Sequence, residues 1–520
     1  MSGNVATKSE ALRDAALAGA SGPSTSEAAV AQRAAGDRVL YAIYAAAVAA
    51  GISVWFLAIR APLWLDETSS FWQISAGFRN ILPRRGLVSA AYPYILWLFT
   101  RVTGTSEVGL RILSVVAMMG AVYLLYRAAE ELFGREIAFI TAAIFAIHPL
   151  VIFSSIDARP YALGTLAITA SIFLLVRLRK SNSMWLAAGF GACAGLIVHF
   201  HLLFGTVLPV LALCFFLMKA GEPRVLWRQL GVAAGVCVVV ALPVIGDFLA
   251  ILRGRQMYVF EKSTASLADL GWTIAPGWLV WIVAGLILIG AATRSIDLQS
   301  RIEPWRVVLC AGAGVVPLFI LYAVTAATPT NVFVDRYRLA GIPGVALLWG
   351  LVLSRVESRW LRVAFCVAAV SATCYQYYRS PFSHLHKYTW KYALELAERN
   401  ASADGAPVVV CSDFPSSDYF PMPQGEAVKD SPMFTPLAYY KLSVPVVGLP
   451  RALNDEAKRD GAEFVANAAA RKQRFLALGW EPSYDTLHWL VNIASQNYEV
   501  RVLGQPDGVV VLEFDPREAE

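Results

Sequence analysis

Long windows without a charged residue are the feature that most constrains this chain. Residues 39–59 and 339–354 contain no acidic or basic side chain, and about 20 consecutive apolar residues are enough to span the hydrocarbon core of a bilayer. Only 16% of the 520 residues are charged, against roughly a quarter in soluble domains. The sequence therefore predicts an all-α polytopic membrane bundle.

About eleven windows have the length that a membrane-spanning helix needs. They are 39–59, 108–126, 136–154, 160–177, 184–200, 202–218, 229–250, 276–293, 306–327, 339–354 and 360–376. The aromatic window 92–102 is only about half the required length. We therefore interpret it as a juxtamembrane or re-entrant helix inside an outer loop that covers 60–107.

Basic residues between the windows indicate the orientation. With the N-terminus inside, every short inner loop is cationic, as the positive-inside rule requires; the residues are Arg127, Arg135, Arg177, Arg179, Lys180, Lys219, Arg224, Arg228, Arg294, Arg301, Arg306, Arg355, Arg359 and Arg362. We expect a multi-pass protein of the plasma (inner) membrane with a cytoplasmic N-terminus. These loops account for most of the net charge of +6, so that charge does not indicate binding to nucleic acid.

The two ends of the chain differ from the transmembrane domain predicted over 38–378. Residues 1–37 are rich in Ala, Ser and Gly and lack aromatic residues, which is typical of a disordered cytoplasmic tail. Residues 379–520 predict a small extracytoplasmic α/β domain, with helices over 391–399 and 456–478, a buried strand over 407–411 and a hairpin of 498–503 with 509–514. The seven cysteines contain no CxxC pair, so neither a zinc site nor a disulfide framework is indicated.

The first candidate site follows the first span directly. Asp66 and Glu67 are adjacent acids behind Trp64 and Leu65. Acidic residues at the membrane are usually functional, and a carboxylate can take a proton from an acceptor hydroxyl. The alternative is an acidic pair at a helix N-terminus that complements the helix dipole.

Two further candidates lie at span ends that we place on the same outer side. Asp157 and Arg159 form either a local ion pair or a site in which Asp157 orients an acceptor or a metal ion and Arg159 binds phosphate. Arg336 and Arg338 could neutralise a lipid phosphate, although an interfacial anchor is the commoner role of such a segment.

His199 and His201 flank a tight turn on this outer side. Such a pair more commonly consists of interfacial histidines whose hydrogen bonds are satisfied than of ligands to a metal ion.

An ordered set of segments resembles the membrane glycosyltransferases of the GT-C superfamily. The most similar group is the family-39 type, which includes protein O-mannosyltransferases and the aminoarabinose transferase of lipid A. The segments are Asp66-Glu67 in the first outer loop; Tyr92-Pro93-Tyr94, similar to the family's His-Pro-Pro-Leu helix; Glu107-Val108-Gly109-Leu110-Arg111; Asp157-Ala158-Arg159-Pro160-Tyr161-Ala162-Leu163, similar to the Glu-Ala-Arg-x-Tyr-Ala-Leu of bacterial members; and Asp335-Arg336-Tyr337 before Pro343. The histidine that usually precedes Pro93 is Ala91 or Tyr92 here.

The resemblance implies a GT-C-type bundle and an inverting transfer of a hexosyl or pentosyl group from a polyprenyl-phosphate donor held in the bilayer. The acceptor would be a cell-envelope lipid, glycan or protein. The implied catalytic acids are Asp66 as general base, with Glu67 and Asp157 positioning the acceptor or, as a potential cofactor, a divalent metal ion. The implied phosphate ligands are Arg159, Arg336 and Arg338, and the implied lining of the substrate cavity is Tyr92, Tyr161, His199 and His201.

The alternative function is that of a polytopic transporter or lipid flippase. Such a protein needs ionisable residues at mid-bilayer depth and often broken helices in repeated halves. Here the ionisable residues gather at span ends, which favours chemistry at the membrane surface.

Overall fold

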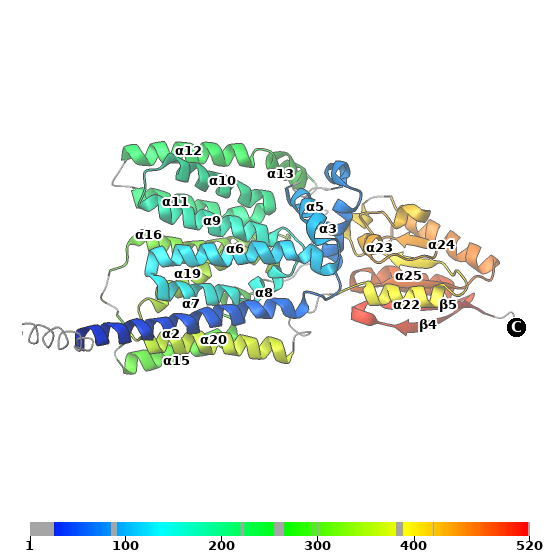
Figure 1. Ribbon diagram of the computed structural model, residues 1–520. Helices are drawn as coiled ribbons and strands as arrows, with labels where there is room; N and C mark the ends of the chain where they lie inside the picture. The colour runs from blue at the N-terminus through cyan, green and yellow to red at the C-terminus, as the bar shows by residue number, and fades with distance from the viewer. Residues whose placement is uncertain are drawn as a thin grey trace, which may run out of the picture.

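The computed structural model describes residues 25–84, 91–219, 223–253, 265–293, 295–297, 299, 301–380, 388–419 and 421–517. Long helices form one body, and a smaller α/β domain sits on one end of it (Figure 1). The start of helix α2 lies at the end of the body that faces away from the α/β domain.

The helical body is made of α2 (Thr25–Ser53), α6 (Glu107–Phe133), α7 (Arg135–Ala146), α8 (Pro149–Ser155), α9 (Tyr161–Arg179), α10 (Met184–Phe200), α11 (Leu208–Lys219), α12 (Pro223–Ala241), α13 (Val244–Arg253), α14 (Leu267–Ile274), α15 (Gly277–Ala292), α16 (Pro304–Val307), α17 (Ala313–Ala327), α18 (Asp335–Arg338), α19 (Ile342–Leu353) and α20 (Arg359–Arg379). Helix α6 packs against α7 and α9, and α10 packs against α9 and α12.

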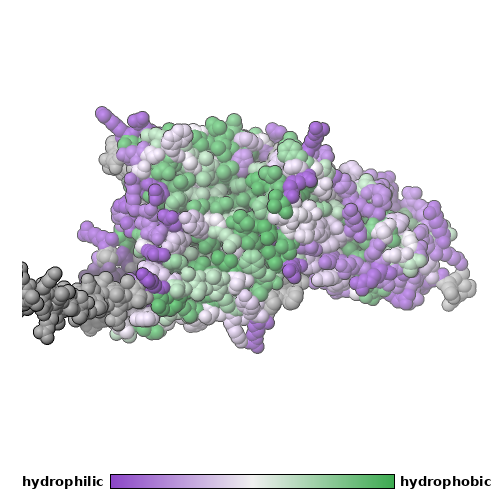
Figure 2. All heavy atoms as spheres, viewed as in Figure 1, coloured by the Kyte–Doolittle hydropathy of each residue, from purple (hydrophilic) through white to green (hydrophobic). Residues whose placement is uncertain are grey.

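Membrane-spanning character is confirmed for the body. Five described helical stretches are long and apolar enough to cross a bilayer: Gly36–Ala58, Glu107–Phe133, Tyr161–Arg179, Arg224–Ala241 and Pro304–Ala327. Helices α7 and α8, bent by 68°, make a sixth if they count as one span. The remaining predicted windows coincide with shorter helices or, for 360–376, with the 21-residue helix α20, which is not among these five apolar stretches, so the number of about eleven spans stays a prediction. Figure 2 shows hydrophobic residues gathered over the middle of the body and hydrophilic residues at its far end and over the α/β domain.

The N-terminal tail differs from its prediction where it is described. Residues 1–24 lie outside the described residues, but residues 25–37 belong to helix α2. This stretch is rich in alanine, the strongest helix former, and it continues directly into an apolar span. The helix therefore extends beyond the apolar window that hydropathy identifies.

A close crossing of two helices fixes the segment that carries Arg336. Helix α19 packs on α17 through Gly344, where a Cβ atom would lie 2.1 Å from the backbone nitrogen of Gly314. Only glycine permits this approach, and the short helix α18 with Arg336 enters the same crossing. The arginine thus sits on a rigid support.

The α/β domain contains one five-stranded sheet. Its strands are β1 (Val408–Cys411), β2 (Val446–Leu449), β3 (Phe475–Gly479), β4 (Tyr498–Gly504) and β5 (Val510–Pro516), in the order β2-β1-β3-β5-β4. The first three strands are parallel, and β5 pairs antiparallel with β3 and β4. The domain's main helices are α22 (Lys391–Ala401), α23 (Thr435–Tyr439), α24 (Asp455–Ala470) and α25 (Tyr484–Ala494).

The predicted hairpin, the strand 407–411 and the helix 391–399 are confirmed, but the helix predicted over 456–478 is too long. Helix α24 ends at Ala470, and Lys472 adopts a left-handed conformation with φ 49°. The following Phe475, Leu476 and Leu478 are completely buried as strand β3. Leu and Ala favour helices, but tertiary burial in the sheet overrides that preference.

Three short helices connect the two parts of the molecule. Helices α3 (Leu65–Ser75), α4 (Ile81–Arg84) and α5 (Ala91–Thr103) lie between the body and the α/β domain (Figure 1). Helix α5 has 13 residues, which agrees with the prediction of a short helix at 92–102. Helix α3 packs against α5 and against α23 of the α/β domain.

Candidate functional site

Asp66 lies in the first turn of α3, at the junction of the two parts. Its carboxylate Oδ2 accepts a hydrogen bond from Arg336 Nη1 at 2.8 Å. Arg159 Nη1 donates to the main-chain carbonyl of Asp66 at 3.1 Å. Three segments that are far apart in the sequence therefore meet at this acid, as the sequence analysis expected.

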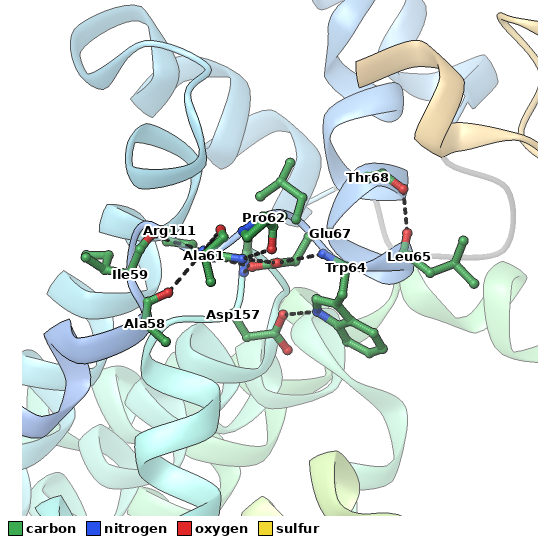
Figure 3. A network of polar contacts seen from close by, with 12 residues as sticks. Ala58, Ile59, Ala61, Pro62, Trp64, Leu65, Glu67, Thr68, Arg111 and Asp157 are labelled. Atoms are coloured by element: carbon green, nitrogen blue, oxygen red, sulfur yellow. Dashed lines mark hydrogen bonds and ion pairs between the residues drawn. The ribbon is translucent and has the colours of Figure 1, made fainter. Parts of the chain in front are cut away.

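Glu67, the neighbouring acid, has a different environment. It is completely buried, and Arg111 binds it with two hydrogen bonds, Nε to Oε1 at 2.8 Å and Nη2 to Oε2 at 2.5 Å (Figure 3). The backbone N–H groups of Trp64 and Ala158 also donate to it, at 3.2 and 2.9 Å. Glu67 thus caps the N-terminus of α3 and joins three segments. For this residue, the structure agrees with the alternative interpretation, that of an acid at a helix N-terminus.

Arg111 extends the same network into the turn before α3. Its guanidinium also donates to the carbonyl oxygens of four residues, Ala58, Ile59, Ala61 and Pro62 (Figure 3). The sequence analysis gave Arg111 no role, although a charge inside a predicted span signals one. Its function is to hold the loop that leads to Asp66.

Asp157 belongs to the same network and binds Trp64, the residue that precedes α3. Its Oδ1 accepts a hydrogen bond from Trp64 Nε1 at 3.0 Å, and its carbonyl accepts one from Ser114 Oγ at 2.5 Å (Figure 3). Asp157 is almost completely buried. It therefore orients the indole of Trp64, a contact that the sequence did not suggest.

A cleft of about 560 Å³ opens beside this network. Aromatic side chains and arginines share its walls; the lining residues are Trp64, Phe153, Ala265, Asp269, Asn331, Phe333, Val334, Asp335, Arg336, Tyr337 and Arg338. A site of this size, mostly apolar with a few convergent polar groups, suits a small organic ligand.

Arg338 lines the cleft but points away from Asp66. It forms an ion pair with Asp335 and donates to Thr273 Oγ1 at 2.7 Å. It also donates to the carbonyl of Asp269 at 3.3 Å. The guanidinium of Arg338 thus already binds three protein groups. The guanidinium of Arg336 binds Asp66.

The two histidines separate in the structure. His199 Nε2 contacts the carbonyl of Val240 at 2.5 Å, on the side of α12. His201 instead stacks on Tyr337 with ring centroids 4.4 Å apart and lies 5.6 Å from Tyr161. Among the described residues, Nδ1 of His201 has no hydrogen-bond partner.

Burial and the nearby guanidinium groups of Arg336 and Arg159 lower the pKa of His201 to about 3. The imidazole is therefore neutral at physiological pH and can exchange hydrogen bonds with a ligand without adding charge. Tyr161 shares its aromatic cluster. Tyr92 is buried on α5, and burial raises the pKa of its phenol well above the usual value.

The acids do not form a metal site by themselves. Among the described residues, no group of three or more His, Cys, Asp and Glu side chains could hold a metal ion. Both oxygens of Glu67 already accept hydrogen bonds from Arg111, so Glu67 and Asp157 do not fit a divalent ion as a ligand pair.

Comparison with known proteins supports a common architecture. The family model described as dolichyl-phosphate-mannose-protein mannosyltransferase matches residues 88–246. No curated protein matches the chain in sequence.

Two solved proteins share the fold at low sequence identity. The crystal structure of ArnT from Cupriavidus metallidurans bound to undecaprenyl phosphate superposes with a TM-score of 0.55 at 13% identity, covering 90% of this chain and 97% of that chain. The apo oligosaccharyltransferase of Archaeoglobus fulgidus gives a TM-score of 0.50 at 12% identity, covering 92% of this chain and 74% of that chain. The likeness extends over the α/β domain as well as the helical body, because it covers nine-tenths of the chain.

Proposed function

We propose that this chain is a GT-C-type membrane glycosyltransferase, which transfers a sugar from a polyprenyl monophosphate to a hydroxyl group of a cell-envelope acceptor; the matching family model and the shared fold support this class. Undecaprenyl phosphate is bound in the related ArnT structure, which supports a donor of this class. The reaction takes place at the end of the bundle that carries the α/β domain. We place this end outside the cytoplasm.

The convergence of Asp66, Arg159 and Arg336 is the observation that carries the proposal. An acid and two cations from three separate segments meet beside the cleft. A transfer from a phosphate carrier needs these two kinds of group: a base for the attacking hydroxyl and fixed cations for the departing phosphate.

The chemical step is an in-line displacement with inversion. The acceptor oxygen bonds to the anomeric carbon while its proton moves to the carboxylate of Asp66. The bond between that carbon and the phosphate oxygen breaks, and its electron pair leaves on the polyprenyl phosphate. Arg336 and Arg159 stabilise the charge that develops there, and fixed donors of this kind usually supply the largest catalytic term.

The ion pair between Asp66 and Arg336 determines that the donor binds before the acceptor is activated. The guanidinium of Arg336 pairs with the carboxylate of Asp66 in the structure. A bound phosphate competes for the same guanidinium, and planar bidentate contacts make arginine well suited to phosphate. Donor binding then turns Arg336 to the phosphate and leaves the carboxylate of Asp66 open to the acceptor.

Aromatic walls give the cleft room for a sugar ring. Trp64 and Phe153 stand in edge contact with ring centroids 6.4 Å apart, and both line the cleft. The hydrogen bond from Trp64 to Asp157 fixes the indole. In this proposal Asp157 positions the donor sugar through Trp64.

The substitution Asp66→Asn tests the proposal. Asparagine keeps the shape of the side chain but cannot take the proton, so transfer should fall by about 10²–10⁴-fold while the protein stays folded. Membranes carrying the variant would receive a panel of radiolabelled undecaprenyl-phosphate monosaccharides with native envelope extract. Asp515→Asn is a matched control, because Asp515 also pairs with an arginine, Arg501, but on the far sheet edge. Near-normal transfer by the Asp66 variant would refute the assignment.

A further inference from the structure

The C-terminal domain contacts the catalytic segment residue by residue. The backbone N–H of Leu63 donates to the hydroxyl of Tyr440 at 2.6 Å. Trp64 forms an isolated antiparallel bridge with Thr389. These are two of the three residues directly before Asp66, and the α/β domain or its entry segment holds both.

The third residue, Leu65, closes the crevice where a domain of this topology usually binds its ligand. Strand β1 lies between the parallel strands β2 and β3, and the chain runs from β1 to its neighbour β2 on one side, whereas from β3 it runs on to β4 and β5 on the other side. Ligands of open α/β sheets bind at such a switch point. Here the cavity is only about 10 Å³, and Leu65 lines it together with Trp390, Val410, Cys411, Ser412, Asp413, Met433, Phe434, Pro436 and Leu437.

This volume is at the lower limit for a single water molecule. The crevice therefore has no space for a sugar or a nucleotide. Leu65 of helix α3 lies where a ligand would otherwise bind.

A relay of two hydroxyl groups adds a polar contact within the same interface. The hydroxyl of Thr68 donates to the carbonyl of Leu65 at 2.7 Å (Figure 3). Its oxygen lies 2.8 Å from that of Thr435 on α23. Because a hydroxyl has only one proton, Thr435 must be the donor to Thr68. Both threonines are buried, so the α/β domain determines the geometry of the first turn of α3.

We propose that the α/β domain is a positioning element for the general base, with Thr435 and Tyr440 as its positioning residues. This inference rests on the proposed function of Asp66. The Arg111–Glu67 network holds the Asp66 segment from the side of the helical body, and the α/β domain holds it from the opposite side. A displacement of the domain therefore moves the carboxylate relative to the cleft, and a shift of about 1 Å in such a group can reduce a rate by about 10²-fold.

The test compares two hydroxyl deletions in the same domain. Thr435→Val removes the donor to Thr68, whereas Thr486→Val removes an equally buried hydroxyl that binds the carbonyl of Arg451 inside the domain. Tyr440→Phe provides a second positioning variant, and the exposed Tyr419→Phe is its control. Full-length protein would be assayed for kcat and KM toward undecaprenyl-phosphate monosaccharides. Hydrogen exchange of the peptide covering residues 63–75 would be followed in parallel.

We expect Thr435→Val and Tyr440→Phe to lower kcat by about 10–100-fold with little change in donor KM, and to speed exchange in residues 63–75. Thr435→Ser, which keeps the hydroxyl, should restore both. A Thr68→Val and Thr435→Val double variant should be no slower than the slower single variant.

Two results would overturn the inference. One is wild-type kcat in both positioning variants while Asp66→Asn is inactive, which would leave the proposed function intact. The other is an equal loss in Thr486→Val, which would assign the effect to domain folding. Full activity of Asp66→Asn would instead remove the proposed function itself.

Discussion

The buried ion pair between Arg111 and Glu67 should dominate the stability of the junction. We consider Arg111→Met, which removes the charge at similar volume, and Glu67→Gln, which removes the opposite charge. The side chains are 1% and 0% exposed and their closest atoms are 2.5 Å apart, so solvent hardly screens the pair. Removing one partner of such a pair costs about 3–5 kcal/mol, because the other charge stays buried without compensation.

The two single variants should differ. In Glu67→Gln, the guanidinium of Arg111 keeps its contacts with backbone carbonyl groups, so the loss should lie near 3 kcal/mol. In Arg111→Met, the carboxylate of Glu67 loses its only charged donor among the described contacts and keeps the backbone N–H groups of Trp64 and Ala158, while those carbonyl groups lose their donor, so the loss should be nearer 5 kcal/mol. Folded proteins have total stabilities of about 5–15 kcal/mol, and Arg111→Met should therefore be the less stable of the two single variants by a clear margin.

The assay is denaturant unfolding of the detergent-purified protein for the two single variants and the double variant. Because the double variant buries no unpaired charge, its destabilisation should be clearly smaller than the sum of the single effects. Arg399→Met is the control, since Arg399 pairs with Glu395 at 3.7 Å with side chains that are 75% and 44% exposed, and such pairs contribute about 1 kcal/mol or less. Additive effects of the two single changes, or single effects as small as the control, would refute this reasoning.

Three further predictions follow from the site, the sheet and the topology. Arg336→Gln should weaken binding of undecaprenyl phosphate by on the order of 2–5 kcal/mol, measured by native mass spectrometry, whereas Arg338→Gln should change it much less. Burial raises the pKa of Asp413 from 3.8 to about 7, so the folded state keeps its proton where the unfolded chain ionises. Stability should then be full below about pH 4 and fall by on the order of 4 kcal/mol as the pH rises through 7, and Asp413→Asn should abolish this fall in thermal unfolding. A cysteine at Val502 should react with an impermeant reagent on intact cells, and one at Ser181 should not.

Hydropathy predicted the helical body well because each span must be apolar along its whole length. It could not reveal how the body is held together at its polar end. The partner of Arg111 is Glu67, which lies 44 positions earlier in the chain, and no local pattern connects them. The same limit explains why the sequence analysis, which expects Glu67 to position the acceptor or a divalent ion, does not connect it with Arg111.

The direction in which a side chain points is the second property that could not be predicted from the sequence. Arg336 and Arg338 lie two positions apart on the short helix α18, and residues at this spacing do not face the same side of a helix. His199 and His201 separate for another reason: α10 ends at Phe200, and His201 is extended with φ −160° and ψ 125°. In each pair only one member joins the cluster at the site, Arg336 by binding Asp66 and His201 by contacting Tyr337, and the choice depends on where a helix begins or ends.

The position of Asp66 between two independent supports has a consequence for how substrates reach it. The Arg111–Glu67 network closes the side of the helical body, and Leu65 closes the crevice of the α/β domain. A cleft of about 560 Å³, lined by Trp64 and Arg336, opens beside these supports. In the proposed mechanism, donor and acceptor therefore meet in that cleft, and the donor phosphate encounters Arg336 there. Because Arg336 also holds the carboxylate of Asp66, the base becomes available in this mechanism only where the phosphate has already bound, so that no acceptor is activated before its donor is in place.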